Sequence, residues 1–278
     1  MFLNMLKMKM QSNWVLIKQH LIEFLKDEVR NTGIQKVIVG LSGGLDSAVV
    51  AILLQEIFKE NFLAVMMPTQ YSSENSLKDA KELIQKFGIR AETVDISKYI
   101  EIFNSDNQNS SALRKGNFSA RIRMATLYDI SARENALVIG TSNKSELLLG
   151  YGTIFGDLAS AVNPIGDIYK SDLFSFAEFL GVPNSIVSKP PSADLFDGQS
   201  DEMEIGYTYS QIDKVFKLFV EERFSKSEIM KKVENKNLVE MLIGRIYKNQ
   251  FKRKMPIIAK ITDRTFGHDF LYARDVQI

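Results

Sequence analysis

A short loop of glycine, serine and aspartate is the stretch of this sequence best suited to chemistry. It reads Gly40-Leu41-Ser42-Gly43-Gly44-Leu45-Asp46-Ser47. A run with β-branched residues at 36–39 precedes it and predicts a buried strand, and apolar residues at 48–58 predict a helix after it. Glycines let the backbone approach a ligand closely, and a helix start offers free N–H groups and partial positive charge. The combination predicts a phosphate site.

Asp46 is the residue that a simple anion site would not contain, because its carboxylate repels phosphate. It is explained if it holds Mg²⁺, which takes hard oxygen ligands and bridges to phosphates. The loop lacks the lysine of a Walker A motif and does not match the dinucleotide fingerprint Gly-x-Gly-x-x-Gly. The plainer alternative is an ordinary turn of small residues, which a lone Gly-Gly would favour.

A second polar segment follows the apolar run at 136–140, which predicts another strand. Thr141 could donate a hydrogen bond to a ribose or phosphate. Glu146 could present a carboxylate back toward the glycine loop and complete an oxygen site for Mg²⁺ with Asp46. Without the first loop, Glu146 would be an ordinary surface residue.

Further candidates lie in the next segments of the chain. Three glycines within 150–156 exclude a stable helix or strand there and predict a binding loop, which ends at Asp157. Lys170 opens a predicted helix and would neutralise charge in a phosphate site, although a lysine there is usually solvated. Arg121 and Arg123 are two residues apart and point to different sides of a predicted helix, with a solvated basic face as the simpler interpretation.

The order of predicted elements indicates an α/β fold with a parallel, doubly wound, flavodoxin-like sheet. In such sheets, ligands bind beyond the carboxyl ends of the strands, at the switch point. We expect a mobile loop at 104–111 and a mobile acidic lid at 197–204. The predicted strands are 36–39, 62–67, 91–96 and 136–140, and the predicted helices are 14–29, 48–58, 76–87, 114–133, 171–180, 209–222, 227–233 and 238–251. The basic side chains at 252–254 end the last predicted helix, where positive charge suits the helix dipole. Alternatively, they contact a substrate phosphate.

Composition narrows the functional classes. With 278 residues, 45% of them hydrophobic, the chain can form one large domain over 1–278. A net charge of +1 disfavours a nucleic-acid partner, and the absence of cysteine excludes disulfides and cysteine nucleophiles. Lysines and an asparagine interrupt the apolar residues at 1–10, which argues against a signal peptide or membrane span. We therefore expect a cytoplasmic protein.

The glycine loop resembles the pyrophosphate loop of the N-type ATP pyrophosphatases, which adenylate a carbonyl or carboxyl oxygen. Five segments occur in an order that resembles one branch of that family, the ammonia-dependent NAD synthetases. The resemblance spans about 14–256, and the segments are 42–47, 116–121, 140–146, 155–157 and 191–195. It implies a homodimer with an adenine-nucleotide α-hydrolase-like fold that amidates deamido-NAD with ammonia, using ATP and Mg²⁺.

The resemblance also implies roles for individual residues. Asp46, Asp157 and Lys170 would be catalytic, with Asp157 where ammonia meets the nicotinate end, and Asp46 and Glu146 would hold Mg²⁺. Arg121 would contact deamido-NAD. The ATP-binding residues would be Gly40, Leu41, Ser42, Gly43, Gly44, Leu45, Asp46, Ser47, Thr141, Lys170 and Ser192.

Three positions depart from the family pattern, namely Ile154 for a common lysine, Ala161 for a common aspartate, and Phe251 for the histidine of a His-Lys pair. They concern the dinucleotide contacts rather than the ATP site. A tRNA-modifying ligase or thiolase would need a basic face or cysteines. A non-catalytic nucleotide-binding module would not need a pair of Mg²⁺ ligands.

Overall fold

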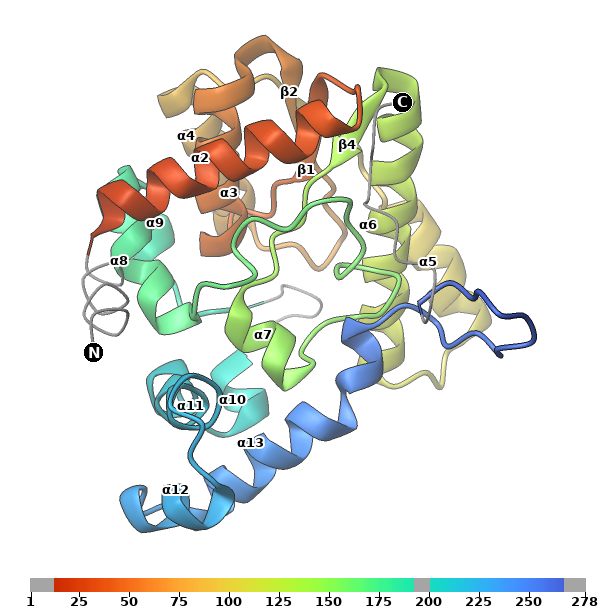
Figure 1. Cartoon of the computed structure of the whole chain (residues 1–278). Coiled ribbons are helices and arrows are strands. Elements are labelled where there is room, and N and C mark those ends of the chain that lie inside the picture. Colours follow the sequence, from red (N-terminus) through yellow and green to blue (C-terminus); the bar gives the residue numbers. More distant parts are fainter. Residues whose placement is uncertain (1–12, 193–200, 268–278) are drawn as a thin grey trace.

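The computed structural model describes residues 13–192 and 201–267 (Figure 1). The segment 1–10, for which a signal peptide or membrane span was not expected, lies outside the described residues. So does 197–200, the first half of the expected lid. No helix in the described ranges is both long and apolar enough to span a lipid bilayer.

A four-stranded parallel sheet forms the centre of the molecule, as the sequence predicts. Its strand order is β3-β2-β1-β4. The strands are β1 (Lys36–Gly40), β2 (Phe62–Met66), β3 (Ala91–Thr93) and β4 (Ala136–Val138). The chain reaches β4 only after leaving the other edge of the sheet, so β1 and β4 flank the switch point where such folds bind ligands.

Helices cover both faces of the sheet because side chains of the strands alternate between two apolar cores. Val37, Val39 and Ala64 belong to one core, and Ile38 and Val65 belong to the other. The first face packs against α2 (Trp14–Asn31), α3 (Leu45–Phe58), α4 (Glu74–Phe87), α8 (Lys170–Leu180) and α9 (Asn184–Val187). The second face packs against α6 (Ala112–Glu134), and α5 (Ser97–Asp106) lies against α6.

The prediction of a loop from residue 104 is wrong in its first part, because α5 continues to Asp106. Asn104 donates a hydrogen bond to the Tyr71 hydroxyl at 3.1 Å. The rings of Phe103 and Phe118 stack with centroids 4.0 Å apart. These tertiary contacts outweigh the turn preference of the Asn- and Ser-rich segment. The third strand is also shorter than predicted, ending at Thr93.

A separate group of helices packs around its own apolar core below the sheet (Figure 1). Asp201 to Ile205 form a helix, so the described part of the expected mobile lid is ordered structure. The last turns of the helices predicted at 209–222 and 238–251 are π- and 3-10-helical. The elements are α7 (Lys144–Leu149), α10 (Asp201–Ile205), α11 (Tyr209–Phe216), η2 (Lys217–Glu221), α12 (Lys226–Lys232), α13 (Lys236–Lys248) and η3 (Gln250–Arg253).

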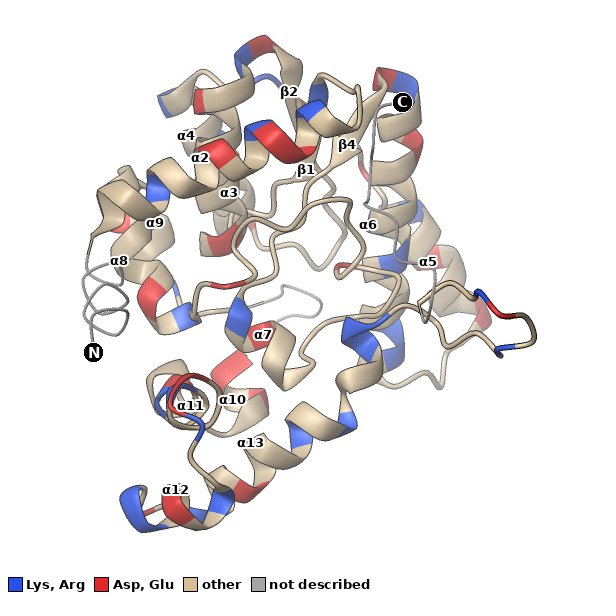
Figure 2. Ribbon diagram, in the orientation of Figure 1, with Lys and Arg blue, Asp and Glu red and all other residues tan. Residues whose placement is uncertain are grey.

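Positions of Lys and Arg and of Asp and Glu are interspersed along the helices drawn in Figure 2. This agrees with the balanced composition of the chain.

Candidate functional site

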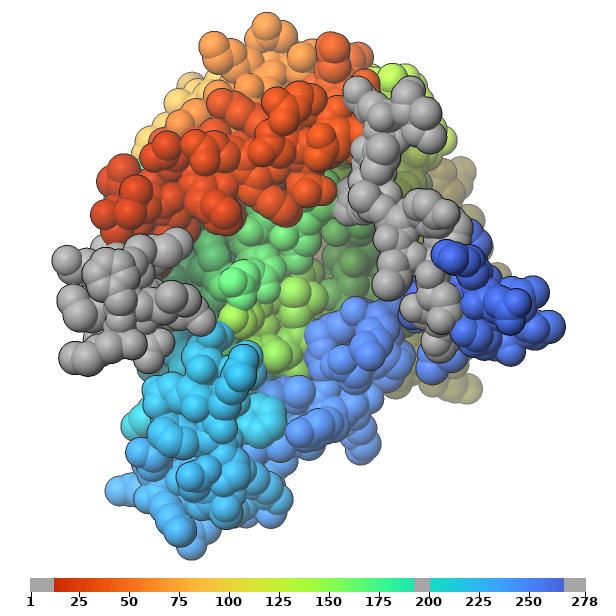
Figure 3. All heavy atoms as spheres, in the orientation of Figure 1, coloured from red at the N-terminus to blue at the C-terminus, as the bar shows by residue number. Residues whose placement is uncertain are grey.

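A cavity of about 1590 Å³ opens at the carboxyl ends of β1 and β4. The segments after β4, drawn in green, are set back between α2 and the blue C-terminal helices (Figure 3). The volume of this cavity exceeds the ~300–1,000 Å³ usual for one small ligand, so the cavity has room for two ligands. The predicted site residues that line it are Gly40, Leu41, Ser42, Gly44, Leu45, Asp46, Ser47, Thr141, Glu146, Asp157, Lys170 and Ser192.

Gly43 does not line the cavity, but its conformation shapes the loop. Its φ is +81°, and a Cβ atom there would lie 2.1 Å from the Ser76 carbonyl oxygen. The loop therefore passes so close to α4 that only glycine fits. Gly44 is the N-cap of α3 and provides no side-chain cap, so the helix start is open to a ligand. The hydroxyl of Ser47 donates to the Gly44 carbonyl at 3.0 Å and tightens this turn.

The two arginines of α6 point to different sides, as predicted. Arg123 lines the cavity, and its Nε donates to the Met67 carbonyl oxygen at 3.3 Å. Arg121 is exposed and donates to the Ile154 carbonyl oxygen at 3.4 Å. In a single chain, Arg121 is therefore not part of the cavity lining.

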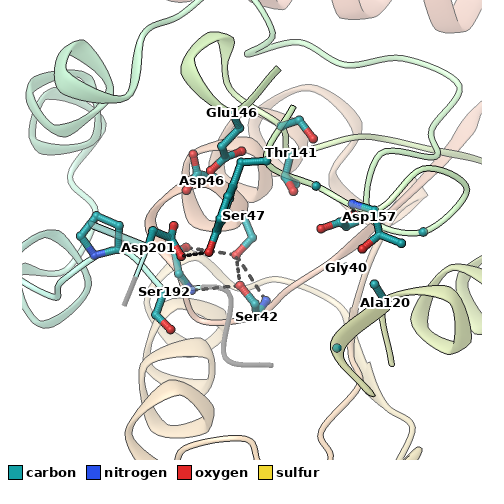
Figure 4. Close-up of a pocket in the computed structure, with 18 of the residues that line it drawn as sticks. Gly40, Ser42, Asp46, Ser47, Ala120, Thr141, Glu146, Asp157, Ser192 and Asp201 are labelled. Carbon is teal, nitrogen blue, oxygen red and sulfur yellow. Dashed lines mark hydrogen bonds between the residues drawn. The ribbon is translucent and has the colours of Figure 1, made fainter. Parts of the chain in front are cut away.

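Lys170, Asp46 and Glu146 form an ionic centre in which Lys170 is buried and the two carboxylates are half-buried, and Asp46 and Glu146 lie close together in Figure 4. The Lys170 ammonium pairs with Asp46 and lies 3.7 Å from Glu146 Oε1. Burial lowers the pKa of Lys170, but the charges of Asp46 and Glu146 raise it more, so its pKa lies above the ordinary value. Burial raises the pKa of Glu146 well above the ordinary value, the charge of Asp46 adds to this, and Lys170 opposes it. The three groups are therefore electrostatically linked.

Asn143 is the residue that holds both carboxylates, and it is fully buried. Its Nδ2 donates to Asp46 Oδ1 at 2.7 Å, and its backbone N–H donates to Glu146 Oε2 at 3.2 Å. The Glu146 N–H donates back to Asn143 Oδ1 at 3.0 Å, which completes a capping box at the start of α7. The signal in the sequence is Asn followed three residues later by Glu, which is typical of this cap.

The donor set at this centre suits a hard divalent cation. Two carboxylates face the same point beside the open start of α3, and Mg²⁺ is usually held by one or two carboxylates together with water and substrate phosphates. The described residues contain no cluster of three or more His, Asp or Glu side chains that would hold a metal without such additional oxygens.

Asp201 is a further acidic residue that the sequence analysis did not identify. It lines the cavity and is 4% exposed. Tyr151 Oη donates to its Oδ1 at 3.1 Å and Tyr209 Oη to its Oδ2 at 3.4 Å. Burial raises the pKa of Asp201, and the charge of Lys170 opposes the rise. Asp201 reaches the cavity only because the C-terminal helices fold beside it. In the sequence it stands among other acidic residues and was not distinguished from them.

Asp157 lies at the end of the glycine-rich segment, away from the Asp46–Glu146 pair (Figure 4). It accepts a hydrogen bond of 2.5 Å from the Thr153 N–H, and Thr153 Oγ1 donates to Asn117 Oδ1 at 2.7 Å. Burial raises the pKa of Asp157, and the bond from Thr153 partly offsets this. The loop is thus a defined turn that presents a carboxyl group to the cavity.

The cations at 252–254 lie beyond the helix on which they were predicted, because α13 stops at Lys248, but Arg253 still donates to the Ile246 carbonyl oxygen in the last turn of α13. Lys252 donates to the carbonyl oxygens of Gly150 and Gly152 at 2.7 and 2.8 Å. Arg253 donates to the Leu147 carbonyl oxygen at 2.6 Å. They therefore stabilise the carboxyl end of α7, where cations and carbonyl groups are complementary.

The three departures from the family pattern occupy different environments. Ile154 contributes its carbonyl oxygen to Arg121. Ala161 packs against the larger core beside the sheet. Phe251 is 59% exposed in η3. None of the three lines the cavity.

The fold and cavity define a nucleotide-using α/β protein with a phosphate loop at the switch point of a parallel sheet. The model of the family described as NAD synthase matches residues 17–256. The chain belongs to the NAD synthase family. The structurally similar NAD synthetases share the adenine-nucleotide α-hydrolase-like fold.

Individual relatives agree with this assignment. The NH(3)-dependent NAD(+) synthetase of Chlorobaculum tepidum is 46% identical over 263 residues, which is 94% of this chain and 95% of the relative. That of Helicobacter pylori is 48% identical, covering 90% of this chain and 98% of the relative. The structure of the Campylobacter jejuni NH3-dependent NAD synthetase aligns with a TM-score of 0.77 at 40% identity, covering 89% and 100% of the two chains. An NMN synthetase from Francisella tularensis aligns with a TM-score of 0.78 at 32% identity, covering 90% and 99%.

Proposed function

We propose that this protein amidates deamido-NAD with ammonia, consuming ATP and releasing AMP, pyrophosphate and NAD⁺. The observation that carries the proposal is the ionic centre of Lys170, Asp46 and Glu146 beside the open start of α3. Such a centre can bind a triphosphate and its counter-cation, and the cavity has room for a second, dinucleotide ligand. Membership of the NAD synthase family supports the choice of substrate.

The reaction takes two steps. The nicotinate carboxylate of deamido-NAD attacks the α-phosphorus of ATP, and pyrophosphate leaves. Ammonia then attacks the acyl carbon of the adenylate, and AMP leaves with the bridging oxygen. Adenylation is needed because a bare carboxylate is a poor acyl donor, and no protein nucleophile takes part. Catalysis rests on positioning and on neutralisation of developing charge.

Residues of the cavity have distinct proposed roles. The loop from Gly40 to Ser47 binds the phosphates through its N–H and hydroxyl groups, and Lys170 neutralises charge on the phosphates. Thr141 and Ser192 bind ATP. Asp46 and Glu146 would hold Mg²⁺, which supplies further neutralisation of the leaving pyrophosphate when bound.

Two further residues would act on the second substrate. Arg121 contacts deamido-NAD. Asp157 lies at the meeting point of ammonia and the nicotinate end. Burial raises the pKa of Asp157, which makes its carboxylate a better acceptor for a proton of ammonium.

The nitrogen donor is ammonia itself. Glutaminase domains of the kind that supply ammonia to longer relatives use a cysteine nucleophile, and the chain contains no cysteine. We therefore expect ammonium to support the reaction and glutamine to fail.

The test is product analysis with purified protein, ATP, MgCl₂ and deamido-NAD, with ammonium or glutamine as the nitrogen donor. We expect NAD⁺ and AMP in equal amounts with ammonium and neither with glutamine. Nicotinate mononucleotide serves as the alternative acceptor, because a similar structure belongs to an NMN synthetase. Release of ADP, or faster turnover of the mononucleotide, would contradict the proposal.

We also propose that 1–278 acts as one domain in a cytoplasmic homodimer without a nucleic-acid partner. Exposed apolar side chains on α5 support a subunit contact there, namely Tyr99 and Ile102. Arg121 lies on the neighbouring helix α6, outside the cavity of a single chain. Light scattering should give the mass of two chains, and Ile102→Glu should lower it toward one. A wild-type monomer at micromolar concentration would contradict the dimer.

A further inference from the structure

We infer that Asp213 is a positioning residue that holds the start of α8 and therefore sets the place of the Lys170 ammonium. The inference rests on the role of Lys170 proposed above. Asp213 lies on α11 in the helical cluster below the sheet, 42 positions after Ser171 in the chain. It does not line the cavity, so it cannot act by touching a substrate there.

Two hydrogen bonds place the Asp213 carboxylate at the start of α8. Its Oδ2 accepts from the Ser171 N–H at 2.8 Å. Its Oδ1 accepts from the Ser145 hydroxyl at 2.5 Å, and Ser145 Oγ in turn accepts from the Lys170 N–H at 2.9 Å. The carboxylate therefore binds one N–H of α8 directly and the preceding N–H through a single hydroxyl.

This arrangement replaces the cap that the helix lacks. The N-cap of α8 is Tyr169, which makes no side-chain cap bond. The N–H groups of Asp172 and Leu173 donate to the Tyr169 carbonyl oxygen at 3.0 Å, whereas those of Lys170 and Ser171 have no acceptor within the first turn. Ser145 and Asp213 supply these two acceptors from other helices.

Burial makes these bonds important for Asp213 as well. Asp213 is 1% exposed, and the neighbouring Ile212, Val215 and Phe216 belong to the apolar core of the helical cluster. A buried carboxylate is costly unless it is hydrogen-bonded or paired, and the positive end of a helix favours its ionised form. The carboxylate and the start of α8 therefore stabilise one another.

Ser145 extends the same arrangement to the second acidic ligand. It is fully buried on α7 and directly precedes Glu146. One carboxylate thus fixes α7 against α8, and with them the distance between Glu146 and Lys170. Displacement of reacting groups by ~1 Å can cost ~10²-fold in rate, so the activity should depend on this contact.

The test compares Asp213→Asn and Ser145→Ala with a matched control, Asp172→Asn. An amide of the same shape at 213 keeps one acceptor oxygen and cannot serve both donors. The control also removes a carboxylate at the start of α8. Asp172, however, pairs with Lys217 at 2.8 Å, and both side chains are partly exposed. Steady-state kinetics and hydrogen exchange at the Lys170 and Ser171 amides are measured for all variants, below their unfolding temperatures.

We expect Asp213→Asn to lower kcat by about 10-fold or more while KM for ATP changes less than about 3-fold, because displacement affects the reacting geometry more than binding. Both amides should exchange at least about 10-fold faster than in the wild type. Ser145→Ala should accelerate exchange at Lys170 more than at Ser171. The control should match the wild type in kcat and in exchange.

A folded Asp213→Asn protein with kcat within about twofold of the wild type would overturn the inference, since a purely structural role predicts only lower stability. Unchanged exchange at both amides would also overturn it. If Asp213→Asn does not fold, Ser145→Ala decides by the same two measurements. Failure of the proposed function would look different, because the wild type itself would make no NAD⁺ while the exchange experiment still reports the contact.

Discussion

Asn143 Nδ2 donates a hydrogen bond of 2.7 Å to Asp46 Oδ1 and so joins two strand ends that lie 97 residues apart in the chain. The same side chain caps α7 and receives the N–H of Glu146. The side-chain amide of Asn143 orients the Asp46 carboxylate, and its backbone N–H donates to the Glu146 carboxylate, so this one residue orients both. Hydrogen bonds of this kind define the direction of ligand groups, and their loss loosens a site without removing its ligands.

Asn143→Ala and Asn143→Ser separate the two functions of this side chain. Serine keeps a good N-cap for α7, whereas alanine loses it, so alanine should cost about 1 kcal/mol more stability than serine. Both lose the bond to Asp46 and should lower kcat by a similar factor of about 10. Urea unfolding and steady-state kinetics measure the two effects. Equal stability of the two variants, or wild-type kcat in either, would contradict this assignment.

The charge of Asp46 can be separated from its hydrogen bond. Asp46→Ala should keep the fold and lower turnover by roughly 10²-fold or more, as expected for loss of a preorganised charge. Asp46→Asn keeps an oxygen that can accept from Asn143 but removes the charge, and it should need more Mg²⁺ for its half-maximal rate. A chelator in excess should stop the wild-type reaction. Wild-type turnover in either variant would show that Asp46 does not hold the cation.

Gly43 and Gly88 form a matched pair for testing the tight approach of the phosphate loop. Both have positive φ, +81° and +63°, but a Cβ at Gly43 would collide with the Ser76 carbonyl whereas the space around Gly88 is open. Gly88→Ala should cost about 1 kcal/mol for the left-handed backbone alone. Gly43→Ala should cost more and abolish ATP binding, measured by calorimetry. If the two variants had similar unfolding free energies and Gly43→Ala still bound ATP, the close approach of the loop to α4 would be contradicted.

The pKa of Asp157 predicts a pH dependence of stability. Burial raises this pKa above the ordinary value of 3.8, so the folded state keeps the proton at pH values where the unfolded state has lost it. The stabilising contribution of this group is therefore present below the ordinary pKa and is lost as pH rises through the folded-state value. Relative to Asp157→Asn, the wild type should lose unfolding free energy as pH rises. Urea titrations at several pH values measure the difference in unfolding free energy between the two proteins. A difference that does not change with pH would contradict the raised pKa of Asp157.

The periodicity of the sequence predicted the central architecture because it depends on local patterns. The β-branched run at 36–39 is visible in the sequence, and so is the phosphate loop that follows it. The structure then divides Val37, Ile38 and Val39 between two cores. The strand order places Thr141 and Glu146 at the predicted edge, beside Asp46.

Other parts of the site depend on contacts between distant segments, which local patterns do not contain. Asp201 and Asp213 look like ordinary acidic residues of surface segments, and only the packing of the helical cluster buries them. Lys252 was assigned to the end of its own helix, whereas it binds carbonyl oxygens about 100 residues earlier in the chain. For Asn143 the capping pattern was visible, but its bond to Asp46 required the fold.

Transfer of ¹⁸O from the substrate carboxylate tests the central claim most directly. Deamido-NAD labelled with ¹⁸O in both oxygens of its nicotinate carboxylate is converted with unlabelled ATP and ammonium, and the products are analysed by mass spectrometry. An acyl-adenylate predicts one labelled oxygen in AMP, one in the NAD⁺ amide and none in pyrophosphate. Unlabelled AMP, or label in inorganic phosphate together with ADP, would contradict adenylation at this site.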